Sequence, residues 1–561
     1  MAAGALWSCS WKRRVTLRAA RFALAILLLA AVVVGIDNLD RPLANPDEGR
    51  YSEISREMAA SGDWITPRLN GIKYFEKPPL QYWASAASLK AFGNEEFAAR
   101  LYVGLAGLAT VLIVGFTAAR LGGTEHAVAT MIALVSSPYF LALGGIVTLD
   151  MGLTLWTSAT FCAWLLAENA REGSTERLRW MLAAWAAMAL AVLSKGLVGI
   201  VFPAATLFIA CLVRRDFSAI RRLEPGYGLM VFLAIAAPWF VAVSIANPEF
   251  PEFFFVHEHF RRFLTTEHRR TEPWWYFLPV LIAGFLPWMF ALPAAIGHAW
   301  RSESLATGDR PLRFALLWSA FVVAFFSLSG SKLPAYILPA FPPLALVVGR
   351  YLVAAPTRQL AVRLAPIPVI ALVLAYLAWH MPEGARDEWT RALYLAARPH
   401  ALGGAAALFA GSLAGALLCW RGRRWLAVVT VALGSVLVIE GLEDAYEALA
   451  PRQSGLAVAA KMRPMLTPGT RLYSVKIYDQ TVPFYIGRTL TLVDYGDEFE
   501  TGLAAEPRLR IDFVGDFVVD WLRDGDAMAI MQPDTYQALR SWGLPMRTLH
   551  EDPRRVLVRK P

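Results

Sequence analysis

The chain has 561 residues, with 54 lysines and arginines against 45 aspartates and glutamates, which gives a formal net charge of +9. Hydrophobic residues make up 56% of the chain and charged residues only 18%, whereas an average soluble chain carries roughly 25% charged residues. This deficit, together with 20 tryptophans and 31 phenylalanines, excludes a soluble enzyme, a disordered protein and a nucleic-acid-binding protein. The composition indicates an integral membrane protein.

Long apolar segments recur along most of the chain. A membrane-spanning helix needs about 20 mostly apolar residues, because the hydrocarbon core is roughly 30 Å thick. By this measure we expect about thirteen spans, at 19–36, 101–119, 127–146, 151–167, 180–194, 197–213, 228–246, 274–297, 312–329, 333–353, 362–380, 401–420 and 425–442. The predicted fold class is therefore an α-helical integral membrane protein.

The basic residues of the short connections indicate the orientation. Five of them precede the first span, from Lys12 to Arg21, and every second connection after it is again rich in arginine. Cytoplasmic loops carry such an excess of lysine and arginine. We therefore expect a cytoplasmic N-terminus and an odd number of spans, which places the C-terminal segment outside the cytoplasm.

The long apolar segments end near residue 443, and the sequence pattern changes to that of a soluble domain. Short β-like runs such as Arg471–Ile477 and Ala527–Met531 alternate with helical stretches from there on, which is typical of a small α/β domain. We predict a transmembrane domain at 1–442, which includes the amphipathic extracytoplasmic loops 37–100 and 247–273, and an extracytoplasmic α/β domain at 443–561. We find no phosphate loop, metal-ligand cluster or nucleophile motif in the latter and expect a structural or partner-contacting cap.

The candidate functional residues gather on the extracytoplasmic side. An ionisable residue at the edge of a span is costly and is a functional candidate by default. The first extracytoplasmic connection contributes Asp47, Arg50, Tyr51, Tyr74, Glu76 and Lys77, and the later ones contribute Asp150, Lys195, Arg262, Lys332 and Tyr336. Asp150 and Lys195 lie in connections of only a few residues, so they must stand at the membrane surface. The pattern is two aspartates, Asp47 and Asp150, within a ring of cations.

Such a set suits a phosphate that is attached to a lipid. Lysine and arginine hold phosphate oxygens through charge-assisted hydrogen bonds. Carboxylates orient polar groups, or stabilise positive charge that develops at an anomeric carbon. A lipid-phosphate sugar brings its head group to this surface while its tail stays in the bilayer, so no nucleotide-sugar site is needed.

Plainer interpretations stand beside these roles. Asp47 and Asp150 could each cap the helix that follows, since aspartate is a favoured N-cap residue. Lys77, Lys195 and Lys332 could extend along apolar surface towards water.

A histidine pair in the second long loop is a separate candidate. His257 and His259, with Glu76, could bind a structural zinc ion, but a single His-x-His pair lacks a closed tetrahedral set. Interfacial histidines are the other interpretation. We expect no cofactor to be required for the chemistry itself.

Five segments of the membrane portion resemble those of a known family, the 4-amino-4-deoxy-L-arabinose lipid A transferases. They are Asp47-Glu48-Gly49-Arg50-Tyr51, Phe75-Glu76-Lys77-Pro78-Pro79-Leu80, Leu149-Asp150, Ser194-Lys195-Gly196 and Ser331-Lys332-Leu333-Pro334-Ala335-Tyr336. The resemblance covers roughly residues 10–440 and places the chain in the wider protein O-mannosyltransferase-like group with the C-type glycosyltransferase fold. Related chains with a similar acidic first loop transfer other sugars.

The resemblance implies a function. The donor would be undecaprenyl phosphate that carries aminoarabinose, and the acceptor would be a phosphate of lipid A. The enzyme would be a monomer among membrane lipids that works at the periplasmic face of the bacterial inner membrane, without nucleic acid. Its product masks a negative charge, which lowers the attraction of polymyxin and other cationic antimicrobial peptides.

The resemblance also implies roles for the residues. The acceptor phosphate is largely ionised near neutral pH, since the second pKa of a phosphomonoester is about 6, so it needs no strong base. We therefore expect Asp47 and Asp150, the catalytic candidates, to position the substrates and to offset developing positive charge. The basic and tyrosine candidates, with Glu76, would bind the donor phosphate and sugar.

Other functions remain open at this point. A polyprenyl-phosphate sugar could be transferred to a protein or to another glycan. A secondary transporter is the alternative from another class, although transporters place their charges near the bilayer midplane between repeated halves. A non-catalytic lipid-binding scaffold is the third alternative.

Overall fold

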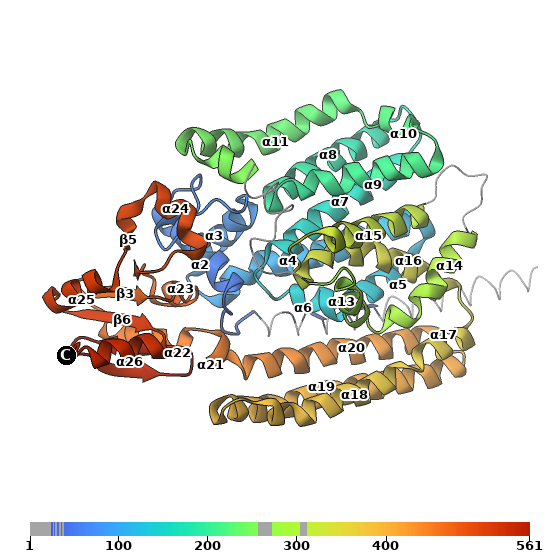
Figure 1. The fold of residues 1–561 in the computed structure, drawn as a ribbon. Helices are drawn as coiled ribbons and strands as arrows, with labels where there is room; N and C mark the ends of the chain where they lie inside the picture. The colour runs from blue at the N-terminus through green and yellow to red at the C-terminus, as the bar shows by residue number, and fades with distance from the viewer. Residues whose placement is uncertain are drawn as a thin grey trace, which may run out of the picture. The chain divides into compact units, whose positions relative to one another are not determined.

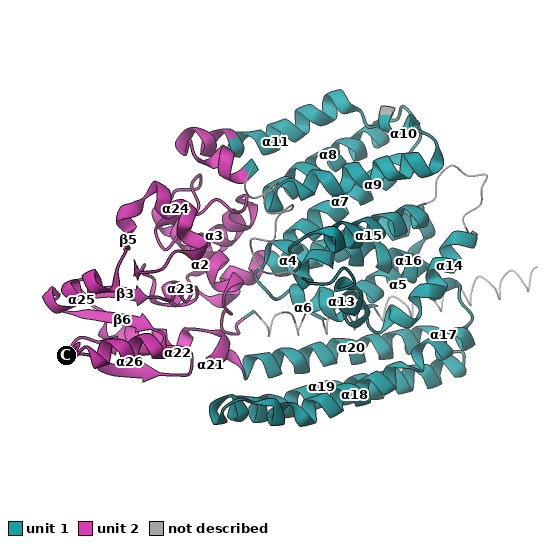
Figure 2. Cartoon of the chain, in the orientation of Figure 1, with its two compact units in different colours: residues 1–39, 103–240, 255–448 teal, residues 40–102, 241–254, 449–561 magenta. Residues whose placement is uncertain are grey.

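The structure is a computed structural model that describes residues 24, 25, 27, 31, 32, 35, 39–255, 272–302 and 311–561. The chain divides into two compact units, which Figure 2 distinguishes by colour. Unit 1 comprises residues 1–39, 103–240 and 255–448, and unit 2 comprises residues 40–102, 241–254 and 449–561. Each unit is therefore assembled from three separate stretches of the sequence.

Unit 1 is built from helices (Figure 1), and α4 and α11 also contain residues of unit 2. The helices in chain order are α4 (Glu96–Gly122), α5 (Thr124–Val135), α6 (Pro138–Leu143), α7 (Leu149–Asn169), α8 (Thr175–Lys195), α9 (Val198–Arg214), α10 (Ser218–Arg221), α11 (Pro225–Ala246), α13 (Phe277–Gly284), η2 (Trp288–Phe290), α14 (Leu292–Ser302), α15 (Pro311–Leu328), η3 (Pro334–Ala340), α16 (Phe341–Ala354), α17 (Thr357–Leu364), α18 (Ile367–His380), η4 (Met381–Gly384), α19 (Glu388–Trp420) and α20 (Arg424–Glu447).

Among the described residues, eight helical segments are long and apolar enough to cross a membrane. They are Glu96–Gly122, Thr175–Lys195, Pro225–Ala246, Pro311–Leu328, Pro334–Ala354, Thr357–Gly384, Glu388–Trp420 and Arg424–Glu447. Each matches one of the thirteen expected spans. Of the other five, 151–167 corresponds to α7 and 197–213 to the 17-residue α9, while most of 19–36 lies outside the described residues.

Two expected spans, 127–146 and 274–297, are interrupted helices. The first breaks between α5 and α6, where Ser137 is extended with ψ 114° immediately before Pro138. The second is divided into α13, η2 and α14 around Pro287. Proline has no N–H to continue a helix and disfavours helical geometry in the residue before it. The apolar composition of both segments was predicted correctly, but their continuity was not.

Aromatic stacking and close helix contacts hold unit 1 together. The ring centroids of Phe161 and Trp318 are 4.2 Å apart, which joins α7 to α15 in the core. Helices α19 and α20 run side by side (Figure 1). A Cβ atom on Gly411 would lie 2.9 Å from the Cα of Gly434. Small residues of this kind let membrane helices approach closely.

Unit 2 combines helices with two sheets. Its elements are α2 (Asp47–Ser61), β1 (Arg68–Leu69), β2 (Ile72–Lys73), α3 (Leu80–Phe92), α21 (Ala450–Gln453), α22 (Leu456–Met462), η5 (Arg463–Met465), β3 (Arg471–Val475), α23 (Val482–Ile486), β4 (Thr491–Val493), η6 (Asp497–Phe499), α24 (Glu500–Ala505), η7 (Pro507–Leu509), β5 (Arg510–Ile511), α25 (Val514–Arg523), β6 (Ala527–Met531), α26 (Pro533–Ser541), β7 (Arg547–Glu551) and β8 (Val556–Arg559).

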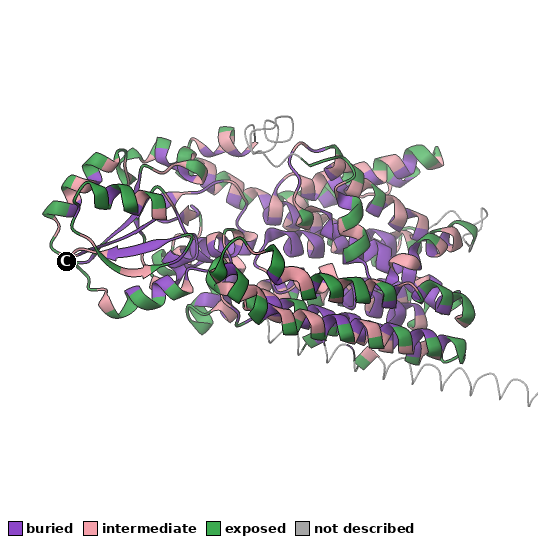
Figure 3. Ribbon diagram, turned by 60° about the horizontal axis from the view of Figure 1, so that its bottom comes forward, coloured by how far each residue is buried: buried purple, intermediate pink, exposed green. Residues whose placement is uncertain are grey.

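The larger sheet has six strands in the order β5-β4-β3-β6-β8-β7. The pairs β5–β4, β4–β3 and β3–β6 are parallel, whereas β8 is antiparallel to β6 and β7 is antiparallel to β8. All five residues of β6 are buried (Figure 3), and Phe517 and Trp521 of α25 pack with the sheet. The strands and helices expected from the alternating pattern after residue 443 are thus present.

Long-range hydrogen bonds tie residues 40–102 to this α/β segment. The N–H of Leu43 donates to the hydroxyl of Tyr485 over 2.7 Å. Asn70 donates from Nδ2 to the carbonyl of Leu490 over 2.7 Å and accepts from the N–H of Leu490 over 2.8 Å. Residues 40–102, which we expected within the transmembrane domain, therefore belong to one compact unit with 449–561. Hydropathy placed residues 37–100 in a loop between spans but gave no sign that this loop packs with the C-terminal segment.

Candidate active site

In unit 2, an arginine lies between two carboxylates. Asp47 is the first residue of α2, and its Oδ1 accepts from Nη1 of Arg50 over 2.7 Å. On its other side, Arg50 pairs through Nε with Glu498 of η6. Gln480 donates from Nε2 to Oε1 of Glu498 over 2.7 Å, which fixes the second oxygen. The N-cap of α2 is Pro46, so Asp47 is not the capping residue and directs its carboxylate to a cation.

Two buried tyrosines adjoin this arginine. Burial raises the pKa of Tyr51 well above its usual value, and the charge of Asp47 raises it further. Burial likewise raises the pKa of Tyr74, with Glu76 as the next cause. Both phenols therefore stay neutral at physiological pH. The Tyr74 hydroxyl is buried and has no hydrogen-bond partner within the part of the chain that the structure describes.

Lys77 lies beside Glu76 in the same segment. Its Nζ donates to the backbone carbonyl of Glu76 over 2.9 Å and lies 3.8 Å from the Glu76 carboxylate. Two prolines follow before α3 begins at Leu80, which restricts the backbone behind the lysine. The cation is thus held next to the Glu76 carboxylate.

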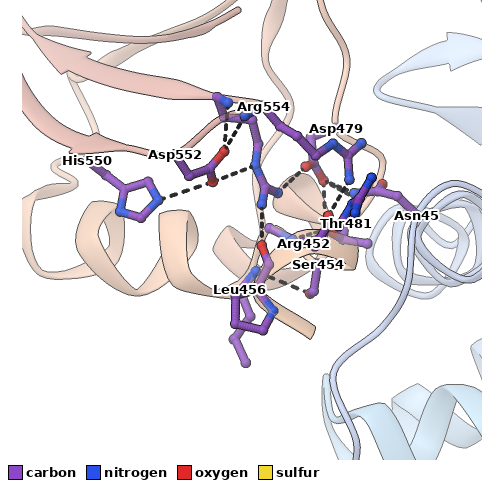
Figure 4. A network of polar contacts seen from close by, with 12 residues as sticks. Asn45, Arg452, Ser454, Leu456, Asp479, Thr481, His550, Asp552 and Arg554 are labelled. Atoms are coloured by element: carbon purple, nitrogen blue, oxygen red, sulfur yellow. Dashed lines mark hydrogen bonds and ion pairs between the residues drawn. The ribbon is translucent and has the colours of Figure 1, made fainter. Parts of the chain in front are cut away.

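A buried polar network anchors the turn that precedes Asp47 (Figure 4). Asp479 accepts from Nδ2 of Asn45 over 2.8 Å and from the hydroxyl of Thr481 over 2.7 Å. It also pairs with Nη1 of Arg555 at 2.5 Å, and Arg555 is paired in turn with Asp552. Burial opposes ionisation of Asp479, but Arg555 and the hydrogen bonds outweigh it and lower its pKa. The network fixes the entry into α2.

Unit 1 holds a second charged pair. Lys195, the last residue of α8, donates from Nζ to Oδ1 of Asp150 in the first turn of α7. The same Nζ lies 4.6 Å from the centroid of the Tyr336 ring, within the range of a cation–π contact. The N-cap of α7 is Thr148, so Asp150 is not a cap. Its carboxylate is directed to the lysine instead.

The expected site residues thus fall into two groups, and some lie elsewhere. Asp47, Arg50, Tyr51, Tyr74, Glu76 and Lys77 belong to unit 2, while Asp150, Lys195, Lys332 and Tyr336 belong to unit 1. Lys332 is buried and donates to the carbonyl of Ser329 over 2.7 Å. Arg262, His257 and His259 lie outside the described residues.

In the ranges that the structure describes, no three histidine, cysteine, aspartate or glutamate side chains are grouped so that they could hold a metal ion. The histidines expected to join Glu76 lie outside those ranges. The zinc site therefore stays a prediction.

Glu498 and its partner Gln480 were missed by sequence reasoning. Glu498 is 448 residues from Arg50 in the chain and lies in a short acidic turn that is typical of a solvated surface. No local pattern distinguishes it from the exposed Glu500 nearby.

The arrangement suits recognition of a charged head group. Arg50 and Lys77 offer donors to phosphate oxygens, and the carboxylates and neutral tyrosines offer partners for sugar hydroxyl and amino groups. In unit 1, the Lys195–Asp150 pair offers a cation and a carboxylate of its own.

Comparisons with known proteins agree with this chemistry. The family model for dolichyl-phosphate-mannose-protein mannosyltransferase matches residues 20–254, and that for the aminoarabinose transferase C-terminal domain matches residues 458–560. The undecaprenyl phosphate-alpha-4-amino-4-deoxy-L-arabinose arabinosyl transferase of Edwardsiella ictaluri is 35% identical over 332 residues, or 59% of each chain. The enzyme of the same name from Erwinia tasmaniensis is 31% identical over 436 residues, which is 74% of this chain and 76% of that one.

A solved structure is similar over nearly the whole chain. The crystal structure of ArnT from Cupriavidus metallidurans bound to undecaprenyl phosphate superposes with a TM-score of 0.90 at 36% identity. The match covers 95% of this chain and 97% of that one. This chain therefore belongs to the family of undecaprenyl phosphate-4-amino-4-deoxy-L-arabinose arabinosyl transferases, which are membrane glycosyltransferases.

Proposed function

We propose that the protein transfers 4-amino-4-deoxy-L-arabinose from undecaprenyl phosphate to a phosphate of lipid A at the periplasmic face of the inner membrane. The observation that carries this proposal is the similarity to the structure of ArnT with undecaprenyl phosphate, at 36% identity over 95% of the chain. The names of the relatives supply the sugar, and the sequence resemblance supplies lipid A as the acceptor. The transferred amine would weaken the attraction of polymyxin and other cationic peptides.

In this reaction an oxygen of the acceptor phosphate forms the new bond to the anomeric carbon. The bond from that carbon to the donor phosphate breaks, and undecaprenyl phosphate leaves with the electron pair. Because the acceptor is already ionised near neutral pH, no residue must remove a proton from it. The protein has to hold two phosphates and offset charge that develops at the sugar.

The site residues divide these tasks between them. Lys77, Lys195 and Arg262 would hold and stabilise the leaving donor phosphate, with Lys332 and Tyr336 as further donor contacts. Arg50, held between Asp47 and Glu498, would serve the donor head group. Asp47 and Asp150 would position the sugar or the acceptor and offset developing positive charge.

We also infer the membrane arrangement and the wider setting of the chain. Thirteen crossings, a cytoplasmic N-terminus and a periplasmic α/β segment are supported by eight long apolar helices and by the alternation of arginine-rich connections. The active form would be a monomer. His257 and His259 with Glu76 would hold a structural zinc ion, and its removal by a chelator should lower stability before it lowers the rate.

The experiment is complementation of a transferase-deficient Gram-negative host, scored by growth on polymyxin and by mass spectrometry of its lipid A. Wild type should restore the aminoarabinose addition, whereas Asp47→Ala and Lys77→Ala should not. The matched control is Glu500→Ala, which changes an exposed carboxylate two residues after Glu498 and should complement. Unmodified lipid A from well-expressed, folded wild-type protein would reject the proposed acceptor, and transfer to a protein or another glycan would then be favoured.

A further inference from the structure

An apolar cavity of about 200 Å³ lies among α7, α8, α9 and α15 of unit 1. Helices α7, α8 and α9 contact one another, and α15 contacts α9 (Figure 1). The wall includes the buried Phe161 and Trp164, whereas Ala204 of α9 is exposed, so the cavity reaches the surface of the unit. Phe208 and Leu212 follow Ala204 at four-residue steps on the same helix face and are also exposed. The opening therefore lies on an apolar surface of the kind that meets lipid chains.

One end of the cavity adjoins a group of charged residues. Leu223 lines the cavity, and Arg222 immediately precedes it. Glu168 lies one turn after Trp164 on α7, and its carboxylate accepts from Nη2 of Arg177 over 3.0 Å and from Nη2 of Arg222 over 2.7 Å. Two guanidinium groups thus share one carboxylate, which leaves one positive charge in this group. Nε of Arg222 is buried and has no hydrogen-bond partner in the ranges that the structure describes.

This basic group is distinct from the candidate active-site pair of unit 1. Asp150 lies in the first turn of α7, and Glu168 lies near the other end of the same helix. At 1.5 Å per residue the two are separated by about 27 Å along the helix axis. In the orientation proposed above, the end that carries Glu168 faces the cytoplasm, where the membrane leaflet presents anionic lipids.

A second, independent observation is the indole N–H of Trp164. The side chain lines the cavity and is 7% exposed, and its Nε1 has no acceptor among the described residues. Trp185, which lines the same cavity, donates from Nε1 to the carbonyl of Leu223 over 2.8 Å. A buried tryptophan N–H usually finds an acceptor, so the missing partner of Trp164 points to a ligand that carries an oxygen. A polyprenyl tail has no oxygen and would leave Trp164 and Arg222 unpartnered.

We propose that this cavity and its basic end bind an anionic glycerophospholipid of the cytoplasmic leaflet. One acyl chain enters the cavity, an ester oxygen accepts from the indole of Trp164, and the phosphate pairs with Arg222. Such a lipid matches the apolar wall, the unpartnered donor and the surplus positive charge together. It is neither the donor nor the acceptor of the proposed reaction, so the inference uses the proposed orientation but not the transfer itself.

The test is native mass spectrometry of the full-length, delipidated protein with added phosphatidylglycerol or with phosphatidylcholine of the same acyl chains. At its tightest site, wild type should bind phosphatidylglycerol about fivefold more tightly, the factor expected for one basic residue beside an anionic lipid. Arg222→Gln should remove this preference and leave phosphatidylcholine unaffected. The matched control is Arg179→Gln, which removes the charge of an exposed arginine of α8 and should leave both affinities unchanged.

A second pair of variants tests the cavity itself. Ala204→Phe adds a ring at the exposed part of the wall and should lower the affinity for phosphatidylglycerol about tenfold, as expected when an acyl chain loses about two buried methylenes. Val213→Phe enlarges a side chain that is 73% exposed on the same helix and should have no effect. Because Ala204 is exposed, its replacement avoids the packed core and keeps the test open if Arg222→Gln fails to fold.

Three results would overturn the inference. Equal affinity of wild type for the two lipids would remove the anionic head group. Phosphatidylglycerol binding that is unchanged in both Arg222→Gln and Ala204→Phe would place the lipid elsewhere. Loss of undecaprenyl phosphate binding in Ala204→Phe, with phosphatidylglycerol binding intact, would assign the cavity to the tail of the donor. Failure of wild type to modify lipid A would overturn the proposed function alone, since lipid binding is measured separately.

Discussion

The buried pair of Asp150 and Lys195 allows the electrostatics of the site to be measured. Their side chains are 8% and 12% exposed, so each charge depends on the other rather than on water. Removing one partner of a buried ion pair costs about 3–5 kcal/mol, because the remaining charge is left unpaired. Asp150→Asn and Lys195→Met should each lower the free energy of unfolding by about that amount. The double variant should recover several kcal/mol of the summed loss.

The assay is equilibrium unfolding in mixed micelles, followed by tryptophan fluorescence and analysed as a double-mutant cycle. The control is the pair of Arg120 and Glu176 in the same unit, whose side chains are 44% and 50% exposed. Exposed pairs of this kind should show a far weaker coupling, because water screens both charges. Additive losses for Asp150 and Lys195, within about 0.5 kcal/mol, would refute the paired geometry.

Two further predictions concern unit 2. Burial and the adjacent charge of Glu53 raise the pKa of Glu57, so the folded state binds this proton more tightly than the unfolded state and loses stability as the pH rises above 4.5. Glu57→Gln should therefore unfold at higher denaturant than wild type at pH 7.5 but not at pH 4, and parallel pH profiles would contradict this. Gly49→Ala would place a Cβ atom 2.6 Å from the backbone of Gln480. It should lower the unfolding temperature, whereas Gly469→Ala, whose Cβ atom would lie 4.0 Å from its nearest neighbour, Oγ1 of Thr467, should not.

The positions of Asp150 and Lys195 could be predicted from the sequence because each lies in a connection of only a few residues between apolar helices. Asp150 and Lys195 had to stand at the ends of apolar helices, where a charge needs a partner. The interrupted helices were harder to foresee, because the apolar run through Pro138 satisfies a hydropathy criterion whether or not its backbone is continuous. Apolar composition determines which segments enter the membrane, whereas residues such as proline determine where a helix within a segment ends.

The part of the site that involves the α/β segment could not be read from the sequence. The expected strands and helices after residue 443 were present, but the attachment of residues 40–102 to that segment depends on contacts such as Asn70 with Leu490, which are 420 residues apart. The pairing of Glu498 with Arg50 could not be predicted for the same reason, because 448 residues separate them. Local sequence patterns predict helices and strands, whereas contacts between residues hundreds of positions apart become visible only in the folded structure.

The proposed reaction, transfer of aminoarabinose from a lipid phosphate to lipid A, can be observed directly in a purified system. The most direct measurement is reconstitution of the purified full-length protein with undecaprenyl phosphate-linked aminoarabinose and lipid A, followed by mass spectrometry of both lipids. We expect that lipid A gains one or more aminoarabinose groups, that undecaprenyl phosphate is released in equal amount, and that Asp47→Ala abolishes both. Release of undecaprenyl phosphate without any sugar on lipid A would contradict the proposed acceptor, and an unchanged donor would contradict the reaction.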